Sequence, residues 1–207
     1  MSAFDTNAEI SKDLKAQKNP QGSKNAFING LIEQIELFVI ILAAIILIFS
    51  FLARTCRVSG DSMNNTLYDG ENVLISDVFY TPVRGDIIVF HQTDPNLISN
   101  NEPIVKRVIA VAGDTVKIEH LKNTMRVTIT DSNGISTVLD EDYIEYDYPT
   151  YPDSVVYVEE GTVFVMGDNR SHSGDSRSAR IGLVDTRRIL GEVILRTTPF
   201  SRFGAID

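Results

Sequence analysis

The chain is divided in two by the stretch LFVIILAAIILIFSFLA at residues 37–53, which has no charged side chain and only Ser50 as a polar one. A helix rises about 1.5 Å per residue, so these residues would span roughly 25 Å, at the short end of what a bilayer-crossing helix needs. A cleavable signal peptide is the main alternative, but it combines a short basic leader with an apolar run of about 7–15 residues. Here the leader is long and carries acids, and the apolar run is longer. We therefore predict a retained transmembrane anchor over residues 35–55.

The segment before the anchor, residues 1–34, is polar. The sequence NPQGS at 19–23 is predicted to break any helix there, and residues 25–36 could form a helix that runs into the anchor. Positive charges lie on both sides of the apolar run: Lys15, Lys18 and Lys24 before it, Arg54 and Arg57 after it. The small excess before the run predicts that residues 1–34 are cytoplasmic and that residues 56–207 lie outside.

Beyond the anchor the pattern changes to short β-branched runs separated by Pro, Gly, Asn and Asp, which is typical of strands and turns. Eight runs are predicted to be strands: Asn72–Ser76, Asp86–Phe90, Pro103–Val111, Thr115–Ile118, Met125–Thr130, Val155–Val158, Thr162–Met166 and Arg188–Arg196. The sequence therefore predicts a mostly antiparallel β domain with few helices over residues 56–207.

Composition excludes several classes of function. The net charge is −9, whereas nucleic-acid binding needs a basic surface, so we expect no nucleic-acid partner. Cys56 is the one cysteine, which rules out an intrachain disulfide and a thiolate metal cluster. The three histidines have no ligand spacing, and we expect no metal and no cofactor.

The segment Leu139–Glu160 is acidic and rich in tyrosine: it contains eight acids, five of the seven tyrosines and no basic residue. Pro149 and Pro152 interrupt it. Two interpretations stay open, a solvated insert at the edge of the domain and a recognition surface.

Ser62 lies in a tight turn, GDSMNNTL at residues 60–67, shortly after the anchor. Serine is a weak nucleophile unless a base lies beside it. Gly60 can adopt positive φ and leaves room for a peptide, and the Ser62 amide could then face a developing oxyanion. The alternative is that Asp61 or Ser62 only caps a turn or a helix start.

Lys106 lies in the middle of the apolar run Pro103–Val111. Alternate residues of a strand share a face, so Lys106 would lie with Ile104, Val108 and Ala110 and no other polar side chain. To act as a base it must lose its proton near neutral pH, and burial can lower its pKa at a cost of roughly 3–5 kcal/mol. The alternative is an edge strand from which the ammonium reaches water. Arg107 faces the opposite way and is predicted to be structural.

A third segment, FVMGDNRSHSGDSR at residues 164–177, runs from a strand into a loop crowded with polar groups. Such a loop could bring a hydroxyl to a buried amine, with an Asp175–Arg177 pair behind it. A solvated surface loop is the alternative. His172 would permit a Ser-His-Asp arrangement, but it lies among polar residues, and we predict no role for it.

Together these segments resemble bacterial-type signal peptidase I, the membrane-bound Ser/Lys peptidases. Residues 62–67 are similar to the family's SMxPTL box, with Asn65 in place of proline, and residues 85–90 to its GDIVVF box. Residues 106–114 are similar to KRVIGLPGD, with Ala112 in place of proline, and residues 167–177 to GDNRxxSxDSR. The two lost prolines affect loop rigidity rather than chemistry.

The resemblance implies a β-barrel-like catalytic domain outside the membrane and an endopeptidase that removes signal peptides from exported proteins after small residues, the A-x-A pattern. It implies Ser62 as nucleophile and Lys106 as general base, and Ser173 as the residue that orients the lysine amine. It gives supporting roles to Asp168, Asp175, Arg177 and Arg107, and substrate contacts to Val58, Met63 and Val105. Some members of the family carry a second serine, two residues before the nucleophile, that donates to the oxyanion. Gly60 occupies that position here, so the Ser62 amide must provide more of the oxyanion stabilisation.

The resemblance also implies partners: secretory preproteins, the lipid bilayer and, as a further candidate, the secretion translocon. Two other readings stay open. One is a non-catalytic relative that assists assembly of pili or other surface proteins, which should have lost Ser62 or Lys106. The other keeps the peptidase but dedicates it to one pilin or one secretion system.

Overall fold

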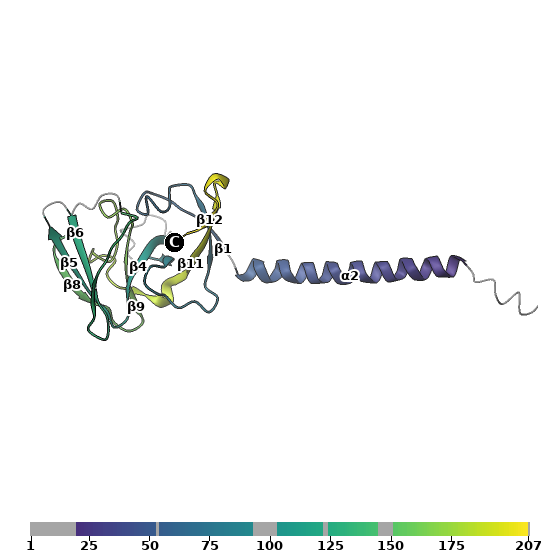
Figure 1. Ribbon diagram of the computed structural model, residues 1–207, viewed down its shortest axis with the longest axis horizontal. Coiled ribbons are helices and arrows are strands. Elements are labelled where there is room, and N and C mark those ends of the chain that lie inside the picture. Colours follow the sequence, from purple (N-terminus) through teal and green to yellow (C-terminus); the bar gives the residue numbers. More distant parts are fainter. Residues whose placement is uncertain (1–19, 53, 93–102, 122–123, 145–150, 207) are drawn as a thin grey trace, which may run out of the picture. The chain divides into compact units, whose positions relative to one another are not determined.

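The computed structural model describes residues 20–52, 54–92, 103–121, 124–144 and 151–206 (Figure 1). The chain divides into two compact units, residues 1–50 and residues 51–207. Residues 1–19 of the expected cytoplasmic segment and residues 145–150 of the acidic segment lie outside the described residues.

The N-terminal unit contains helix α2, Pro20–Leu52. The predicted break at 19–23 is wrong, because Gln21, Gly22 and Ser23 are helical. Pro20 is the first helical residue, a position where the missing N–H of proline costs nothing and its fixed φ favours the helix. The helix also ends before residue 55, the predicted end of the anchor, because Arg54 and Thr55 belong to a strand.

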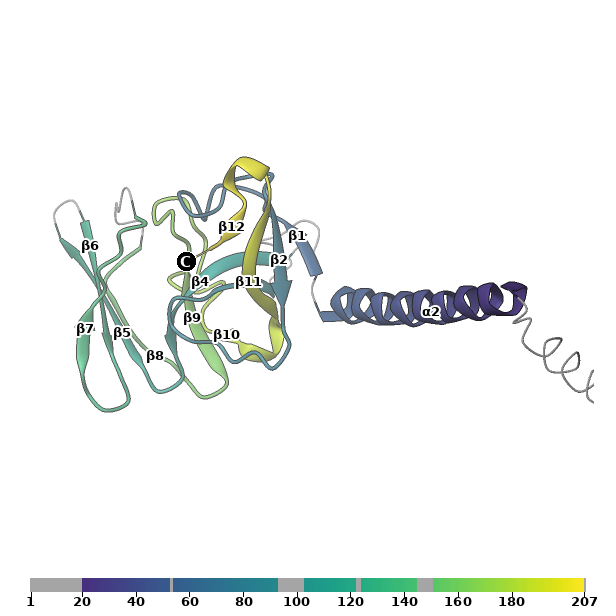
Figure 2. The ribbon, with the colours of Figure 1, turned by 45° about the vertical axis from the view of Figure 1, so that its right-hand side comes forward.

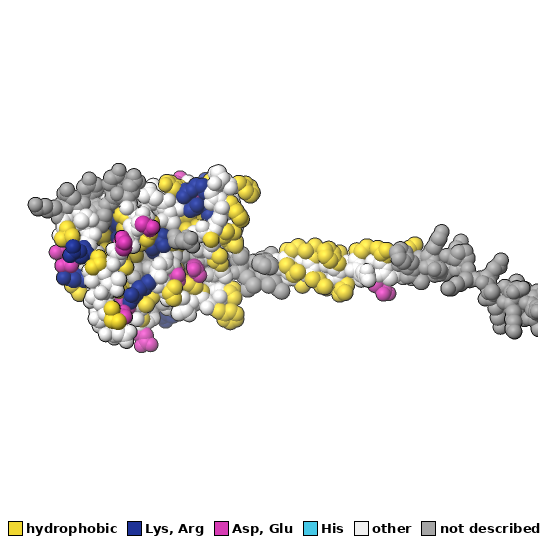
Figure 3. All heavy atoms as spheres, in the orientation of Figure 1, with side chains coloured by type: hydrophobic (Ala, Val, Ile, Leu, Met, Phe, Trp, Pro, Cys, Tyr) yellow, Lys and Arg dark blue, Asp and Glu magenta, His cyan; other side chains and the backbone are white. Residues whose placement is uncertain are grey.

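Within α2, residues Ile28–Leu47 are long and apolar enough to cross a membrane. None of these residues is buried within the protein, unlike those of a helix in a soluble core. Figure 3 shows apolar side chains along this part of the helix. The helix therefore presents an apolar surface that water would solvate poorly.

The second unit consists of antiparallel strands in two sheets (Figures 1 and 2). The larger sheet has the order β1 (Arg54–Arg57), β2 (Asn72–Ser76), β11 (Ile189–Thr198), β3 (Ile87–His91), β4 (Pro103–Val111), β9 (Thr162–Met166) and β10 (Val184–Asp185), and β12 (Gly204–Ala205) pairs with β11. The smaller sheet has the order β7 (Ser136–Val138), β6 (Thr124–Thr130), β5 (Thr115–Leu121) and β8 (Ser154–Tyr157). Two short 3₁₀ helices, Thr186–Arg188 and Phe200–Arg202, complete the unit.

The expected mostly antiparallel β domain is confirmed, and every predicted run overlaps a strand. The larger sheet has β1 and β10 at its two ends and does not close, so it is barrel-like only in a loose sense. Four strands were not predicted: β1, β7, β10 and β12. Each has two to four residues, too few for an alternating pattern to distinguish a strand from a loop.

Three apolar clusters hold this unit together. One lies between the smaller sheet and strands β4 and β9 of the larger sheet, with Phe164 and Met166 among its members. A second contains Met63 and Leu67 from the turn at residues 60–67, which we call the serine turn. These side chains pack against residues of β2, β3 and β11. A third joins β3, β4 and β9 through side chains such as Ile88 and Val165. The second cluster fixes the serine turn onto the large sheet.

The predicted face of β4 is interrupted. Its pairing with β9 shifts in register between Val108 and Ala110, and the two side chains belong to different clusters. The irregularity adds a residue to one strand, so the alternation expected from Ile104 to Ala110 does not continue past Val108.

Candidate active site

Ser62 lies in the turn that joins β1 to β2. Gly60 has φ +88°, a left-handed conformation that glycine adopts without strain, and its amide donates to the Asp69 carboxylate at 2.9 Å. The half-buried Ser62 follows two residues later, and the amide of Asn64 closes the turn onto the carbonyl of Asp61 at 3.1 Å. The turn therefore presents the serine hydroxyl from a fixed backbone.

Lys106 lies in the interior of the larger sheet, because β4 pairs with β3 on one side and β9 on the other. Its side chain is 4% exposed. The Nζ atom is 2.6 Å from Ser62 Oγ and donates to the Val105 carbonyl at 2.7 Å. The alternative of a lysine that reaches water from an edge strand is therefore wrong.

Burial lowers the pKa of Lys106 from 10.5 to about 8. Desolvation is the main cause, and the positive charge of Arg177 acts in the same direction. The carboxylates of Asp175 and Asp168 oppose it, because negative charge stabilises the ammonium. The free amine is therefore accessible near neutral pH, as a general base requires.

The backbone of Ser62 is held by Asn169. The Asn169 amide donates to the Ser62 carbonyl at 3.0 Å, and its side-chain nitrogen donates to the Asp61 carbonyl at 3.1 Å. Within the described part of the chain, the amide N–H of Ser62 has no hydrogen-bond partner. It is therefore free to donate to an oxyanion. Sequence alone gives no role to Asn169, although it lies within the GDNR motif at residues 167–170.

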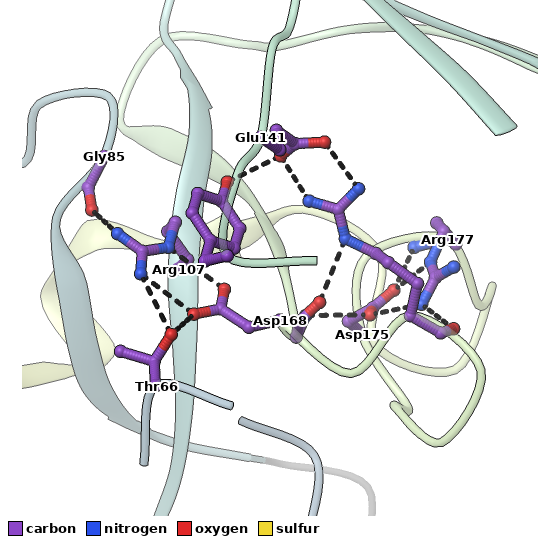
Figure 4. Close-up of polar contacts among 10 residues, drawn as sticks. Thr66, Gly85, Arg107, Glu141, Asp168, Asp175 and Arg177 are labelled. Carbon is purple, nitrogen blue, oxygen red and sulfur yellow. Dashed lines mark hydrogen bonds and ion pairs between the residues drawn. The ribbon is translucent and has the colours of Figure 1, made fainter. Parts of the chain in front are cut away.

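Asp168 and Arg107 form a buried ion pair behind the serine turn. Arg107 donates to the Asp168 carboxylate through Nε at 3.0 Å and Nη2 at 2.9 Å, and to the Gly85 carbonyl through Nη1 at 2.9 Å (Figure 4). The Thr66 hydroxyl donates to the same carboxylate. The pair therefore links β4, the GD turn at residues 85–86 and the end of the serine turn.

Asp175 and Arg177 brace the following loop. The Asp175 carboxylate, with 0% exposure, accepts from the Gly167 amide at 3.0 Å and from Arg177 Nε and Nη2, each at 2.8 Å (Figure 4). Arg177 also donates to the Arg170 carbonyl at 2.8 Å. These contacts hold residues 167–177 as one compact loop.

Ser173 does not make the hydrogen bond to Lys106 that the family resemblance implied. Its hydroxyl is buried and finds no partner among the described residues. It packs instead against Gly167, where an added Cβ would lie 2.2 Å from Ser173 Oγ and 2.5 Å from the Ser62 carbonyl oxygen. Ser173 therefore lies next to the backbone of Ser62 in this structure.

Gly167→Ala should disable the site, because a real Cβ cannot approach other atoms so closely and the loop or the serine turn must shift. We expect activity to fall by more than tenfold and stability to fall by about 1–3 kcal/mol. Gly174→Ala is the matched control in the same loop, since its Cβ would meet only Ile181 at 3.9 Å. Peptide cleavage rates and thermal melts of both variants test this, and equal behaviour of the two would contradict it.

A groove of about 560 Å³ lies beside Ser62 and Lys106. Both Ser62 and Lys106 line it, together with Cys56, Arg57, Val58, Ser59, Asp69, Val73, Val89, Pro103, Ile104 and Val105. The predicted substrate contacts Val58 and Val105 thus lie at the groove. Met63 does not line the groove: it is buried in the second apolar cluster, because the turn directs the residue after Ser62 into the core.

Other candidates for chemistry lie elsewhere. His172 is exposed, and the described contacts of Ser62 and Lys106 do not include it. Among the described residues, no group of three or more His, Cys, Asp or Glu side chains is arranged to hold a metal ion.

The chain is similar to a known protein family and to individual members of it. Residues 31–198 match the family model described as signal peptidase, peptidase S26. A probable signal peptidase I-1 of Synechocystis is 34% identical over an alignment of 200 residues that covers 92% of each chain. Signal peptidase IB of Staphylococcus aureus is 32% identical over an alignment of 194 residues that covers 83% of this chain and 93% of that protein. The crystal structure of a signal peptidase I from Enterococcus faecalis is 30% identical and covers 55% of this chain and 97% of its own, with a TM-score of 0.39.

The family match covers most of the chain and includes most of the apolar stretch Ile28–Leu47 and the groove lined by Ser62 and Lys106. The two relatives are matched over more than nine-tenths of their own length. The chain therefore belongs to the S26 family and is a membrane-anchored signal peptidase.

Proposed function

We propose that Ser62 and Lys106 form the catalytic dyad with which this protein cleaves signal peptides from secretory preproteins. The observation that carries the proposal is the 2.6 Å contact between Lys106 Nζ and Ser62 Oγ at the side of an open groove. A hydroxyl and a desolvated amine at this distance can exchange a proton directly.

The reaction follows from this geometry. Ser62 Oγ attacks the scissile carbonyl carbon while its proton passes to the Lys106 amine. The Ser62 amide donates to the oxyanion, and the resulting ammonium returns the proton to the leaving amine as the peptide bond breaks. Water then attacks the acyl-enzyme, with the amine of Lys106 as base again, and the serine is released.

The remaining residues of the site have supporting roles. Asp168 and Arg107 hold the serine turn through Thr66, and Asp175 and Arg177 hold the loop that carries Asn169. Ser173 lies beside the Ser62 backbone, and we assign it to the shape of the site. A non-catalytic relative is not favoured by any contact in the structure, because the dyad is complete.

Cleavage should require small side chains one and three residues before the cut. The resemblance to the family implies this pattern, and Val58 and Val105, to which it gives substrate contacts, both line the groove beside Ser62. The test is incubation of the detergent-solubilised protein with an A-x-A precursor and with matched precursors that carry Phe at either position. Cleavage of the A-x-A precursor alone supports the proposal, and no cleavage of any precursor, or equal cleavage of all, would contradict it.

We further propose that residues 1–34 are cytoplasmic and that the peptidase domain, residues 56–207, lies outside with its active serine close to the bilayer. The charge balance around the apolar run and the short connection between α2 and Ser62 support this arrangement. It would bring the active site to the point where a preprotein emerges, with the secretion translocon as a candidate neighbour that crosslinking in membranes can identify.

Proteolysis of intact spheroplasts tests the sidedness. External protease should degrade the peptidase domain and spare an N-terminal tag, and the protein should remain in the membrane after alkaline extraction. The opposite pattern of protection would overturn the arrangement, because a cytoplasmic active site could not meet translocated precursors.

A further inference from the structure

Part of the acidic segment Leu139–Glu160 lies against the catalytic machinery rather than in solvent. Three of its side chains, Glu141, Tyr143 and Tyr151, are each in contact with an arginine of the site. We refer to these three residues as the acidic clamp. The interpretation of the segment as a solvated insert is therefore wrong for the clamp.

Glu141 is the partner of Arg170, which has 0% exposure. Arg170 Nη1 donates to Glu141 Oε2 at 2.7 Å, and Nη2 donates to the other oxygen, so the pair is bidentate. Arg170 Nε donates to the Gly167 carbonyl at 3.0 Å. A buried guanidinium without its carboxylate is strongly unfavourable, so the place of Glu141 determines the place of Arg170 and of Gly167 behind it.

Tyr143 and Tyr151 cover the two other arginines. The Tyr143 ring lies 4.1 Å from Arg107 Cζ, and its hydroxyl donates to Glu141 at 2.6 Å. The Tyr151 ring lies 4.9 Å from Arg177 Cζ, and its hydroxyl is 3.4 Å from the Ser173 carbonyl. A guanidinium stacked on an aromatic face is held in one plane, and its carboxylate partner is held with it.

Each arginine connects the acidic clamp, through hydrogen bonds and ion pairs, to the backbone around Ser62. Arg107 binds Asp168, and Asp168 binds Thr66 in the serine turn. Arg170 binds the carbonyl of Gly167, and Arg177 holds Asp175 against its amide. Gly167 packs on the Ser62 carbonyl. Figure 4 shows Glu141, Arg107, Asp168, Asp175 and Thr66 in this arrangement.

We propose that Glu141, Tyr143 and Tyr151 are positioning residues for the peptidase reaction, which act through Arg107, Arg170 and Arg177 to hold Ser62 opposite Lys106. The proposal rests on the proposed dyad. The clamp does not line the substrate groove, so it should affect the chemical step and leave substrate binding unchanged. Misplacement of reacting groups by about 1 Å can cost on the order of 100-fold in rate.

The first test compares Glu141→Ala, Glu141→Gln and Glu141→Asp in the full-length protein with an A-x-A peptide. We expect kcat to fall about 10- to 100-fold in the Ala variant, with KM within about twofold. Asp should recover part of the loss, because it keeps a carboxylate near Arg170, whereas Gln should recover less. The control is Asp142→Ala, an exposed acid next to Glu141, which should stay within twofold of wild type.

The second test separates the ring from the hydroxyl. Tyr143→Phe keeps the aromatic face over Arg107 and loses only the hydrogen bond to Glu141, whereas Tyr143→Leu loses both. We expect kcat to decrease more in Leu than in Phe, and the same order for Tyr151. Glu141→Ala combined with Arg170→Met should be no slower than the slower single variant, because both changes break one pair.

Thermal melts give the folded fraction of each variant at the assay temperature, so that kcat is expressed per folded molecule. Wild-type kcat per folded molecule in Glu141→Ala would overturn the proposal, as would a loss that resides in KM alone. These outcomes differ from failure of the dyad itself, which would appear as an inactive wild-type protein or an active Ser62→Ala variant.

Discussion

Ser62→Ala and Lys106→Met should each reduce kcat/KM for an A-x-A peptide by a factor on the order of 10⁴ or more. The first change removes the nucleophile. The second removes the amine 2.6 Å from its oxygen, and no other base is within hydrogen-bond distance of Ser62 in the described structure. Methionine suits this test because it fills the volume of a buried lysine without its charge. The measurement is peptide cleavage followed by mass spectrometry, which also identifies the bond that is cut.

The double variant should be no slower than either single variant, because residues that act as one unit have non-additive effects. His172→Ala is the control and should have wild-type activity, since the side chain is exposed. A Lys106→Met variant that retained most of its kcat/KM would show that another group is the base. A complete loss in His172→Ala would restore the Ser-His-Asp arrangement that the sequence permits.

The second large effect is on the pH dependence of kcat/KM, which should rise with pH through an apparent pKa of about 8 and then level off. The active form is the neutral amine, and below the pKa its fraction falls tenfold for each pH unit. At pH 6 the rate should therefore be about 100-fold below the plateau. Burial produces this effect, because without it the same limb would appear near 10.5, the ordinary pKa of lysine.

The profile should be measured with one peptide in several overlapping buffers, with a melt at each pH to show that the protein stays folded. The residual activity of Lys106→Met should not show the rise in kcat/KM with an apparent pKa of about 8. A limb near pH 4 to 5, the range of a carboxylate, that persists in Lys106→Met would contradict the assignment of the base.

Local patterns determined the elements of this protein. Strands β2, β4 and β9 have the bounds predicted from their β-branched residues, because β-branched runs and the flanking turn residues are local properties. The apolar run likewise identified the helix, although its ends at Pro20 and Leu52 depend on the first helical position and on the strand that follows. Ser62 and Lys106 could be proposed from the sequence because their segments, together with residues 85–90 and 167–177, resemble the boxes of one family. Either segment alone was also compatible with a structural role.

The tertiary structure decided which groups meet. Lys106 and Ser62 are 44 positions apart, and Asp168 lies 102 positions from Thr66, so no local pattern shows that they are in contact. Packing also placed Met63 in the core rather than in the groove, and it left Ser173 against Gly167 instead of Lys106. The acidic segment shows the difference most clearly. Its composition fits a solvated insert or a recognition surface, yet buried arginines elsewhere in the chain require partners, and Glu141, Tyr143 and Tyr151 supply them. Desolvation of a charge depends on the whole fold, and only the fold can show which polar residues compensate it.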